Sequence, residues 1–203
     1  MPLKIKICGL TREEDVDRAV ALGAAFAGFV LHDKSPRFAD FPLLERLLAR
    51  LARRVPAVGV FVNPAPEFLR KAMALGLDIA QLHGAEPPEF FSGLPFPVWK
   101  AFRLRSGAEV AAAAASPADR VLVDADCGPL YGGSGQAADG GLAARLAARR
   151  PVVLAGGLNA GNLRAAAAAV RPWALDVSSG VESAPGVKSS EKLEALFAAA
   201  RGL

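Results

Sequence analysis

The sequence of 203 residues is poor in the side chains that build metal clusters and disulfide frameworks. It has two cysteines and two histidines, and Cys8 and Cys127 stand far apart, in no spacing typical of a metal site. Because a disulfide framework needs several cysteines, we expect a reducing compartment, the cytoplasm. No apolar run reaches the ~18 residues of a membrane span, and no secretory leader pattern opens the chain. These absences predict a soluble, cytoplasmic protein with no membrane partner.

A strong charge of one sign is also lacking. The formal net charge is +4, the lysines and arginines are scattered, and few aromatic residues stand beside them. This pattern is typical of a solvated surface, so we expect no nucleic-acid partner. A mild positive balance still favours a small anionic substrate. The hydrophobic content of 52% is enough for one substantial core, which predicts a single domain over residues 1–203.

Short β-type runs alternate with helical segments along the whole chain. The predicted strands are Leu3–Cys8, Ala27–Leu31, Ala57–Val62, Asp78–Leu82, Val98–Phe102, Arg120–Asp124, Val152–Ala155 and Ala174–Val177. The predicted helices are Arg12–Leu22, Pro42–Arg53, Pro66–Leu75, a short Pro87–Ser92, Ala108–Ala115, Gly140–Arg149, Ala160–Val170 and Ser190–Ala200. Such alternation implies parallel strands with right-handed crossovers, and eight units favour a closed (β/α)8 barrel, a TIM barrel, over an open sheet. Thr11 followed by Glu14 predicts a capping box at the first helix.

Polar or reactive side chains recur where the predicted strands end, whereas the strand interiors are Val, Ile, Leu and Ala. In strand order these residues are Cys8; His32, Lys34 and Arg37; Asn63; Gln81 and His83; Arg103; Asp124; Gly156 and Gly157; and Ser178, Ser179 and Gly180. Active sites of (β/α)8 barrels are built at the carboxyl ends of the strands. The pattern therefore predicts one active site shared by all eight strands.

Cys8 ends the first strand, directly before Gly9. A free cysteine is often a small buried hydrophobe, but this position favours a catalytic proton carrier, which needs a nearby cation to ionise. Side chains alternate along a strand, so Lys6 shares the face of Cys8 and points into the barrel. A buried ammonium group needs a carboxylate partner. Parity leaves Asp124 and Asp176 as candidates.

Asp124 ends a buried strand, where a carboxylate costs free energy unless a ligand or partner compensates its charge. A helix cap or an ion pair would explain it structurally. As a functional group it is a candidate general acid, and that role predicts a pKa raised by partial burial.

The loops after the seventh and eighth strands are candidates for a phosphate site. Gly156, Gly157, Ser179 and Gly180 can turn backbone N–H groups toward an anion, as such loops often do in these barrels. The alternative interpretation is that both loops are simply turns without a role in ligand binding. A further glycine-rich stretch, residues 131–135, predicts a mobile lid or another phosphate contact.

Two more polar residues have candidate roles in ligand binding. Arg37 can form a fork with a substrate carboxylate, although a lone arginine is more often a surface charge. His83 is interpreted as a polar wall residue of the site. No cluster of His, Asp and Glu accompanies it, which argues against a metal ligand.

Taken together, the motifs resemble the phosphoribosylanthranilate isomerase family of tryptophan biosynthesis. The matching stretches are Lys6–Thr11, Gly28–Val30, Ser35–Arg37, Gly59–Asn63, Gln81–Gly84, Val123–Asp124, Gly132–Gly135, Ala155–Leu158 and Asp176–Glu182, which cover the chain in order. The resemblance implies a (β/α)8 barrel without cofactor or metal. It also implies an isomerase that converts N-(5′-phosphoribosyl)anthranilate to 1-(2-carboxyphenylamino)-1-deoxyribulose 5-phosphate by an Amadori rearrangement.

The resemblance assigns roles to single residues. It makes Cys8 the general base and Asp124 the general acid, and it makes Arg37 the contact for the anthranilate carboxylate. The phosphate contacts it implies are the backbone of Gly156, Gly157, Ser179 and Gly180.

Two other classes of function stay open at this stage. One is another phosphosugar barrel enzyme, such as an epimerase, which would need metal-type His and Asp sets, or a synthase, which relies on Lys and Glu pairs. The other is a non-catalytic phospholigand-binding barrel, which would keep the last two loops but could lose Cys8 or Asp124. Apolar residues expected at the surface, Phe38, Phe41 and Phe68, permit a homodimer.

Overall fold

The structure is a computed structural model that describes residues 3–124 and 138–203. Eight parallel strands close into a barrel in the chain order β1 to β8, which confirms the predicted (β/α)8 architecture. Cys127 and the glycine-rich stretch 131–135 lie outside the described residues. Within those residues, no helix has both the length and the apolar character that a membrane crossing requires.

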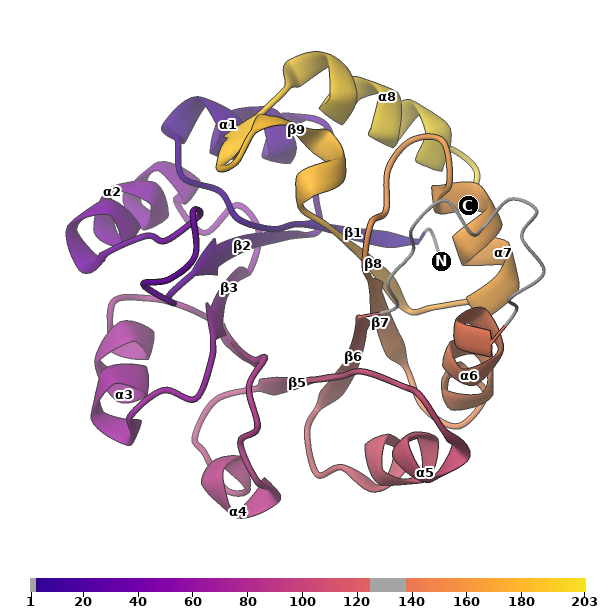
Figure 1. The fold of residues 1–203 in the computed structure, drawn as a ribbon. Helices are drawn as coiled ribbons and strands as arrows, with labels where there is room; N and C mark the ends of the chain where they lie inside the picture. The colour runs from indigo at the N-terminus through magenta and orange to yellow at the C-terminus, as the bar shows by residue number, and fades with distance from the viewer. Residues whose placement is uncertain (1–2, 125–137) are drawn as a thin grey trace.

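Helices surround the barrel in chain order, so that the first and last helices are neighbours (Figure 1). The strands are β1 Lys4–Ile7, β2 Phe26–Val30, β3 Ala57–Phe61, β4 Ile79–Leu82, β5 Val98–Phe102, β6 Arg120–Asp124, β7 Val152–Ala155 and β8 Ala174–Val177. The helices are α1 Glu13–Ala21, α2 Phe41–Leu51, α3 Pro66–Ala74, α4 Pro88–Phe91, α5 Gly107–Ala115, α6 Ala138–Ala147, α7 Leu163–Val170 and α8 Ser190–Ala200. The predicted elements are therefore present, and none of their ends is displaced by more than three residues.

Helix α2 shows why these segments become helices. Leu44, Leu47 and Leu51 recur at helical spacing and are buried against the barrel. The Asp40 side chain accepts a hydrogen bond from the Leu43 backbone N–H at 2.9 Å, which satisfies one of the free donors of the first turn. Side chains alternate between the two faces of each strand, and the outward-facing ones pack against the helices.

The start of α1 differs from the sequence-based expectation. Its N-cap residue is Arg12, and no side chain caps the helix, so the predicted capping box of Thr11 and Glu14 is wrong. The Thr11 hydroxyl instead donates a hydrogen bond to the Gly186 carbonyl, more than 170 residues away in the chain. A tertiary contact has replaced the local one.

That contact leads to an element that the sequence did not predict. After β8, a 3-10 turn η2 (Ser179–Val181) leads into a short antiparallel hairpin, β9 (Glu182–Ala184) and β10 (Val187–Lys188). The hairpin lies beside α1 and before α8, above the ends of β1 and β8 (Figure 1). It is therefore close to Cys8.

Inside the barrel, the side chains that point inward form two levels. At the amino ends of the strands the rings of Phe26, Trp99 and Trp173 form an aromatic cluster, with centroids 5.0 to 5.9 Å apart. At the carboxyl ends the lumen opens into a polar pocket. The barrel is thus filled at one end and open at the other.

The three phenylalanines expected at the surface are half-buried instead. The rings of Phe41 and Phe68 stack with centroids 5.1 Å apart, and both pack against the main core. Stacking between α2 and α3 therefore accounts for the burial of Phe41 and Phe68 without a partner chain.

Candidate active site

A pocket of about 230 Å³ opens at the carboxyl ends of the barrel strands, as predicted. Its lining residues are Cys8, Val60, Gln81, His83, Asp124, Ala155, Gly156, Gly157, Leu158, Asp176, Ser178, Ser179 and Gly180. The structure thus brings together Cys8, His83, Asp124, Gly156, Gly157, Ser179 and Gly180, whereas Arg37 and several other polar strand-end residues do not line the pocket. Polar side chains line the pocket where strands β1, β4, β6 and β8 end.

Lys6 lies beneath the pocket and is completely buried. Its Nζ lies 3.0 Å from each carboxylate oxygen of Asp176, its neighbour in the β1–β8 ladder. The prediction of a carboxylate beside Lys6 is confirmed, and the partner is Asp176, not Asp124. Gly28 leaves room for the pair, because a Cβ at that position would meet Lys6 Nζ at 3.0 Å.

Cys8 lies above this ion pair and is 7% exposed. Burial raises the pKa of the Cys8 thiol, because the thiolate loses its hydration, and the positive charge of Lys6 opposes the rise without cancelling it. Lys6 is affected by the same groups. Burial alone would lower the pKa of Lys6, but Asp176 and Cys8 raise it above its ordinary value. At neutral pH the free protein therefore holds Cys8 as a thiol.

Asp124 lies on another wall of the pocket, and its side chain is 32% exposed. Its Oδ2 is 3.8 Å from His83 Nε2. The pKa of Asp124 is lowered, mainly by its polar contact with His83, which outweighs partial burial. The expectation of a raised pKa was therefore wrong. A neighbouring imidazole, which the sequence did not place, reverses the effect of burial.

Gln81 holds the other side of the His83 ring. Gln81 Nε2 lies 3.1 Å from His83 Nδ1, and Gln81 is 1% exposed. Donation from this amide to Nδ1 leaves the remaining ring N–H on Nε2, facing Asp124. Gln81, His83 and Asp124 thus form one polar chain across the pocket wall.

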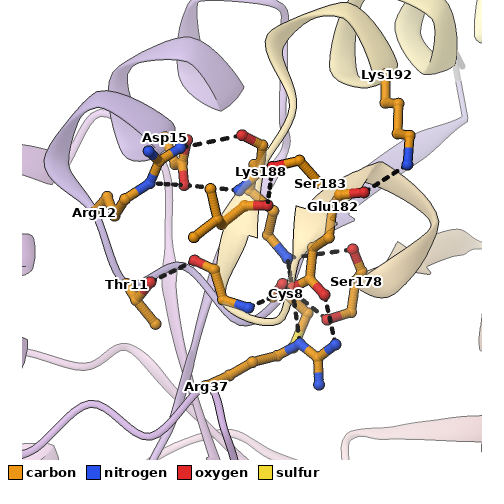
Figure 2. Close-up of polar contacts among 12 residues, drawn as sticks. Cys8, Thr11, Arg12, Asp15, Arg37, Ser178, Glu182, Ser183, Lys188 and Lys192 are labelled. Atoms are coloured by element: carbon orange, nitrogen blue, oxygen red, sulfur yellow. Dashed lines mark hydrogen bonds and ion pairs between the residues drawn. The ribbon is translucent and has the colours of Figure 1, made fainter.

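Arg37 lies outside the pocket lining, at its rim. Its Nε and Nη2 form a fork with Glu182, at 2.8 and 2.5 Å from the two carboxylate oxygens. Lys188 Nζ donates to the same carboxylate at 2.8 Å and to the Ser178 carbonyl at 3.2 Å (Figure 2). Burial would raise the pKa of Glu182, but the hydrogen bonds from Arg37 and Lys188 outweigh it and lower that pKa.

Glu182 contacts Arg37 and Lys188 contacts Glu182, and sequence reasoning gave neither residue a role. Burial lowers the pKa of Lys188 more strongly than Glu182 raises it, which marks a cation held well inside the protein. Both residues belong to the hairpin that was not predicted.

The loops after β7 and β8 touch each other where the phosphate site was predicted. Gly156 and Gly157 have positive φ angles of 98° and 61°, a conformation that suits glycine. A Cβ on Gly180 would lie 1.9 Å from the Leu158 carbonyl oxygen, so only glycine fits there. Gly180 is therefore required by the close approach of the two loops, and Gly156 and Gly157 by their backbone conformation.

Comparisons with known proteins agree with this geometry. The family model "N-(5'phosphoribosyl)anthranilate (PRA) isomerase" matches residues 5–199. The chain belongs to this family. An N-(5′-phosphoribosyl)anthranilate isomerase from Bordetella bronchiseptica is 44% identical over 218 residues, covering 100% of this chain and 98% of the relative.

Solved structures of the same family superimpose closely. One is a phosphoribosylanthranilate isomerase in complex with reduced 1-(o-carboxyphenylamino)-1-deoxyribulose 5-phosphate, with a TM-score of 0.88 and 35% identity over 99% of this chain and 100% of that one. Another comes from the dimeric enzyme of Thermotoga maritima, with a TM-score of 0.86, 35% identity and the same coverage. The predicted family and fold are confirmed.

Some polar strand-end residues of this isomerase-family chain do not line the pocket. These are His32, Lys34, Asn63 and Arg103, and the structure shows a scaffold role for Asn63. Asn63 has a φ angle of 46°, and its side-chain oxygen accepts a hydrogen bond from the Ala85 N–H at 2.7 Å, which fixes the turn after β3. Among the described residues, no group of three or more His, Cys, Asp and Glu side chains is arranged to hold a metal ion.

Proposed function

We propose that this pocket catalyses the Amadori rearrangement of N-(5′-phosphoribosyl)anthranilate to 1-(2-carboxyphenylamino)-1-deoxyribulose 5-phosphate. The protein is an isomerase of the family that performs this step of tryptophan biosynthesis. One observation carries the proposal for the residues: a thiol and a carboxyl group line a single cavity together with the glycine-rich loops after β7 and β8. The reaction needs one base, one acid and a phosphate anchor, and the pocket can supply each.

In the proposed mechanism, Asp124 donates a proton to the furanose ring oxygen, and the ring opens to a Schiff base. Cys8, as a thiolate, takes the proton from C2′. The resulting enolamine then tautomerises to the ketone. Because Cys8 and Asp124 come from different strands, β1 and β6, they can reach the reacting carbons from different sides. Each proton transfer is worth about 10²–10⁴ in rate.

The protonation states favoured in the free protein are the reverse of those that this mechanism uses. Cys8 has a raised pKa and Asp124 a lowered one, so that the thiol and the carboxylate predominate at neutral pH. We propose that the reactive form is reached when the thiol proton leaves Cys8 and the Asp124 carboxylate gains a proton, which leaves a thiolate and a carboxylic acid with the same total number of protons. Lys6 and Lys188 lower the cost of the thiolate that remains.

The two ends of the substrate are proposed to bind at opposite sides of the pocket. The backbone of Gly156, Gly157, Ser179 and Gly180 takes the phosphate, and Arg37 takes the anthranilate carboxylate. Such anchors orient the reacting atoms and can lower the barrier by several kcal/mol. We therefore expect Arg37→Ala mainly to raise KM. An unchanged KM would discredit this role.

Turnover of phosphoribosylanthranilate tests the proposed function directly, because the reaction changes the anthranilate-type fluorescence. An isomerase gives a progressive loss of this signal with the wild-type chain and none with a chain that lacks both Cys8 and Asp124. A barrel that only binds phosphorylated ligands would retain affinity for the reduced product without turnover. A different phosphosugar enzyme would leave the signal constant.

A homodimer of this chain and a cytoplasmic location are also proposed. The dimer draws support from the enzyme of Thermotoga maritima, which is described as dimeric, although the solved chain is a monomer generated from it. Light scattering decides it, since a dimer has twice the chain mass of 21.0 kDa. The cytoplasmic location rests on the cysteine content alone.

A further inference from the structure

We propose that Glu182 is a positioning residue for the reaction: it holds Arg37 in the orientation that recognises the substrate's ring carboxylate. The inference rests on the proposed role of Arg37 and extends it to the β9–β10 hairpin. It commits to a specific consequence, which is discrimination between ligands that carry an aryl carboxylate and ligands that lack one.

The Arg37 guanidinium is fixed along one edge. A guanidinium group has five N–H donors, and Glu182 takes one from Nε and one from Nη2. Nη1 has no hydrogen-bond partner among the described residues 3–124 and 138–203. One edge of the fork is thus used to orient the group, and the remaining N–H groups face away from Glu182, where a carboxylate can accept them.

The stem of Arg37 is fixed as well. It crosses the chain at Gly9, where an added Cβ would lie 2.5 Å from Arg37 Cδ. Gly9 has a φ angle of 73° and directly follows Cys8. Arg37 therefore passes over the residue beside the catalytic thiol, and any rotation of its side chain would move the guanidinium relative to Cys8.

Glu182 is itself held in place by buried groups. Its side chain is 5% exposed, and it accepts hydrogen bonds from Lys188 Nζ at 2.8 Å and from the Gly186 N–H at 3.3 Å. Lys188 Nζ is anchored in turn on the Ser178 carbonyl. The buried ion pair of Glu182 therefore differs from the surface ion pair of Arg50 and Asp17, whose side chains are 53% and 31% exposed.

The hairpin connects this arrangement to the segment that follows Cys8. The Lys188 N–H donates to Asp15 at 3.0 Å, and Arg12 binds both that carboxylate and the Lys188 carbonyl (Figure 2). The hairpin that carries Glu182 is therefore fixed to the start of α1. Lys188 Nζ also reaches the Ser178 carbonyl, and the Ser178 hydroxyl donates to the Cys8 carbonyl at 3.1 Å, so Glu182 is linked to the strand end that carries Cys8.

Two effects of Glu182 have opposite signs and can be separated. If its main effect is orientation, Glu182→Gln weakens binding of a carboxylated ligand, because the guanidinium is free to rotate and must be ordered on binding. If its main effect is charge, the same substitution strengthens that binding, because a negative charge near the ligand carboxylate is removed. The proposal requires the first result.

The experiment measures inhibition constants for two probes. One is the reduced product, reduced 1-(o-carboxyphenylamino)-1-deoxyribulose 5-phosphate, and the other is its counterpart without the ring carboxylate. Their ratio of inhibition constants is the carboxylate discrimination of the enzyme. It is compared in the wild type, Arg37→Ala, Glu182→Gln, the Arg37→Ala/Glu182→Gln double variant, and Glu194→Gln, which makes the same chemical change in an exposed ion pair with Arg18.

We expect Glu182→Gln to reduce the discrimination by about 10-fold, the effect typical of a lost hydrogen bond to a charged group. Glu194→Gln should leave it unchanged. In the Arg37→Ala background, Glu182→Gln should have no further effect, because Glu182 acts through Arg37. A discrimination that is constant or higher in Glu182→Gln, or that falls further in the double variant, overturns the proposal.

Failure of the proposed function gives a different result. If Arg37 does not bind the carboxylate, Arg37→Ala itself leaves the discrimination unchanged. If Glu182→Gln does not fold because Lys188 is left without a carboxylate, Glu182→Gln with Lys188→Met replaces it, and the same outcomes apply. The melting temperature of each variant shows whether that variant is folded, and therefore whether Glu182→Gln or its replacement is used in the comparison.

Discussion

The two walls of the pocket are built in opposite ways. Around Cys8, on β1, β8 and the hairpin, buried ion pairs hold each group at two or more points, as with Lys6 and Asp176. Around Asp124, on β4 and β6, the contact with His83 is 3.8 Å long and both side chains are about a third exposed. We call these the base wall and the acid wall, after the roles proposed for Cys8 and Asp124. The base wall is buried and tightly connected, whereas the acid wall is partly exposed to solvent.

This contrast explains why the two pKa values move apart. Burial dominates at Cys8 and favours the neutral thiol, whereas a neighbouring imidazole dominates at Asp124 and favours the carboxylate. In the free protein the proton is therefore on Cys8, the group that is proposed to accept one. This is the distribution that the two proton transfers leave behind, so the reactive distribution is the minor one before each turnover.

The strongest test of the comparison removes the functional group from each wall. We expect Cys8→Ala and Asp124→Asn each to reduce kcat by about 10²–10⁴, with little change in KM, because each abolishes one proton transfer. Steady-state kinetics measures both values. Near-normal turnover in Cys8→Ala would remove the base wall from the mechanism.

The buried ion pair should be the largest contributor to stability on the base wall. Lys6→Met leaves Asp176 buried without a partner, and we expect the free energy of unfolding to fall by about 3–5 kcal/mol. Urea titration measures the change. The exposed pair of Arg18 and Glu194 is the control, since Glu194→Gln should lower it by about 1 kcal/mol or less.

A companion variant separates pairing from packing. If the loss in Lys6→Met comes from the unpaired carboxylate, Lys6→Met with Asp176→Leu should recover much of it, because no buried charge remains. A double variant that is less stable than Lys6→Met would show that the base wall needs these charges for its shape.

On the acid wall, the titration of Asp124 should respond to His83. The pKa of Asp124 lies below its ordinary value, so the carboxylate predominates at neutral pH, and we expect His83→Ala to move that pKa upward. The contact stabilises the fold above an ordinary Asp pKa of about 3.9 and is lost as the pH falls through the lowered value. Carbon-13 NMR of the carboxyl group follows this titration. His32→Ala, outside the pocket, should leave it unchanged.

The smallest expected effect concerns the reactivity of the free thiol. Since the pKa of Cys8 is raised, its alkylation by iodoacetamide should be slow at neutral pH and should accelerate only above the ordinary thiol pKa of about 8.5. A Cys127→Ser background isolates the signal of Cys8. Rapid alkylation at pH 7 would mean that Lys6 outweighs burial and that the two walls do not differ as described.

The elements of the fold were predictable because they depend on local patterns. Alternation of side chains placed Lys6 inside the barrel and limited its partner to two aspartates, but the choice of Asp176 depended on the barrel register. The fork between Arg37 and Glu182 joins residues 145 positions apart through a hairpin with no strong sequence signal. The lowered pKa of Asp124 depends on the position of one imidazole, which no spacing encodes.

The aromatic cluster at the closed end of the barrel has an optical consequence. Trp99 and Trp173 are the two tryptophans of the chain, and their ring centroids lie 5.9 Å apart, at the opposite end of the strands from the pocket. Intrinsic tryptophan emission should therefore report whether the barrel is closed, while the anthranilate chromophore reports the chemistry. One sample can reveal unfolding and turnover as two independent signals.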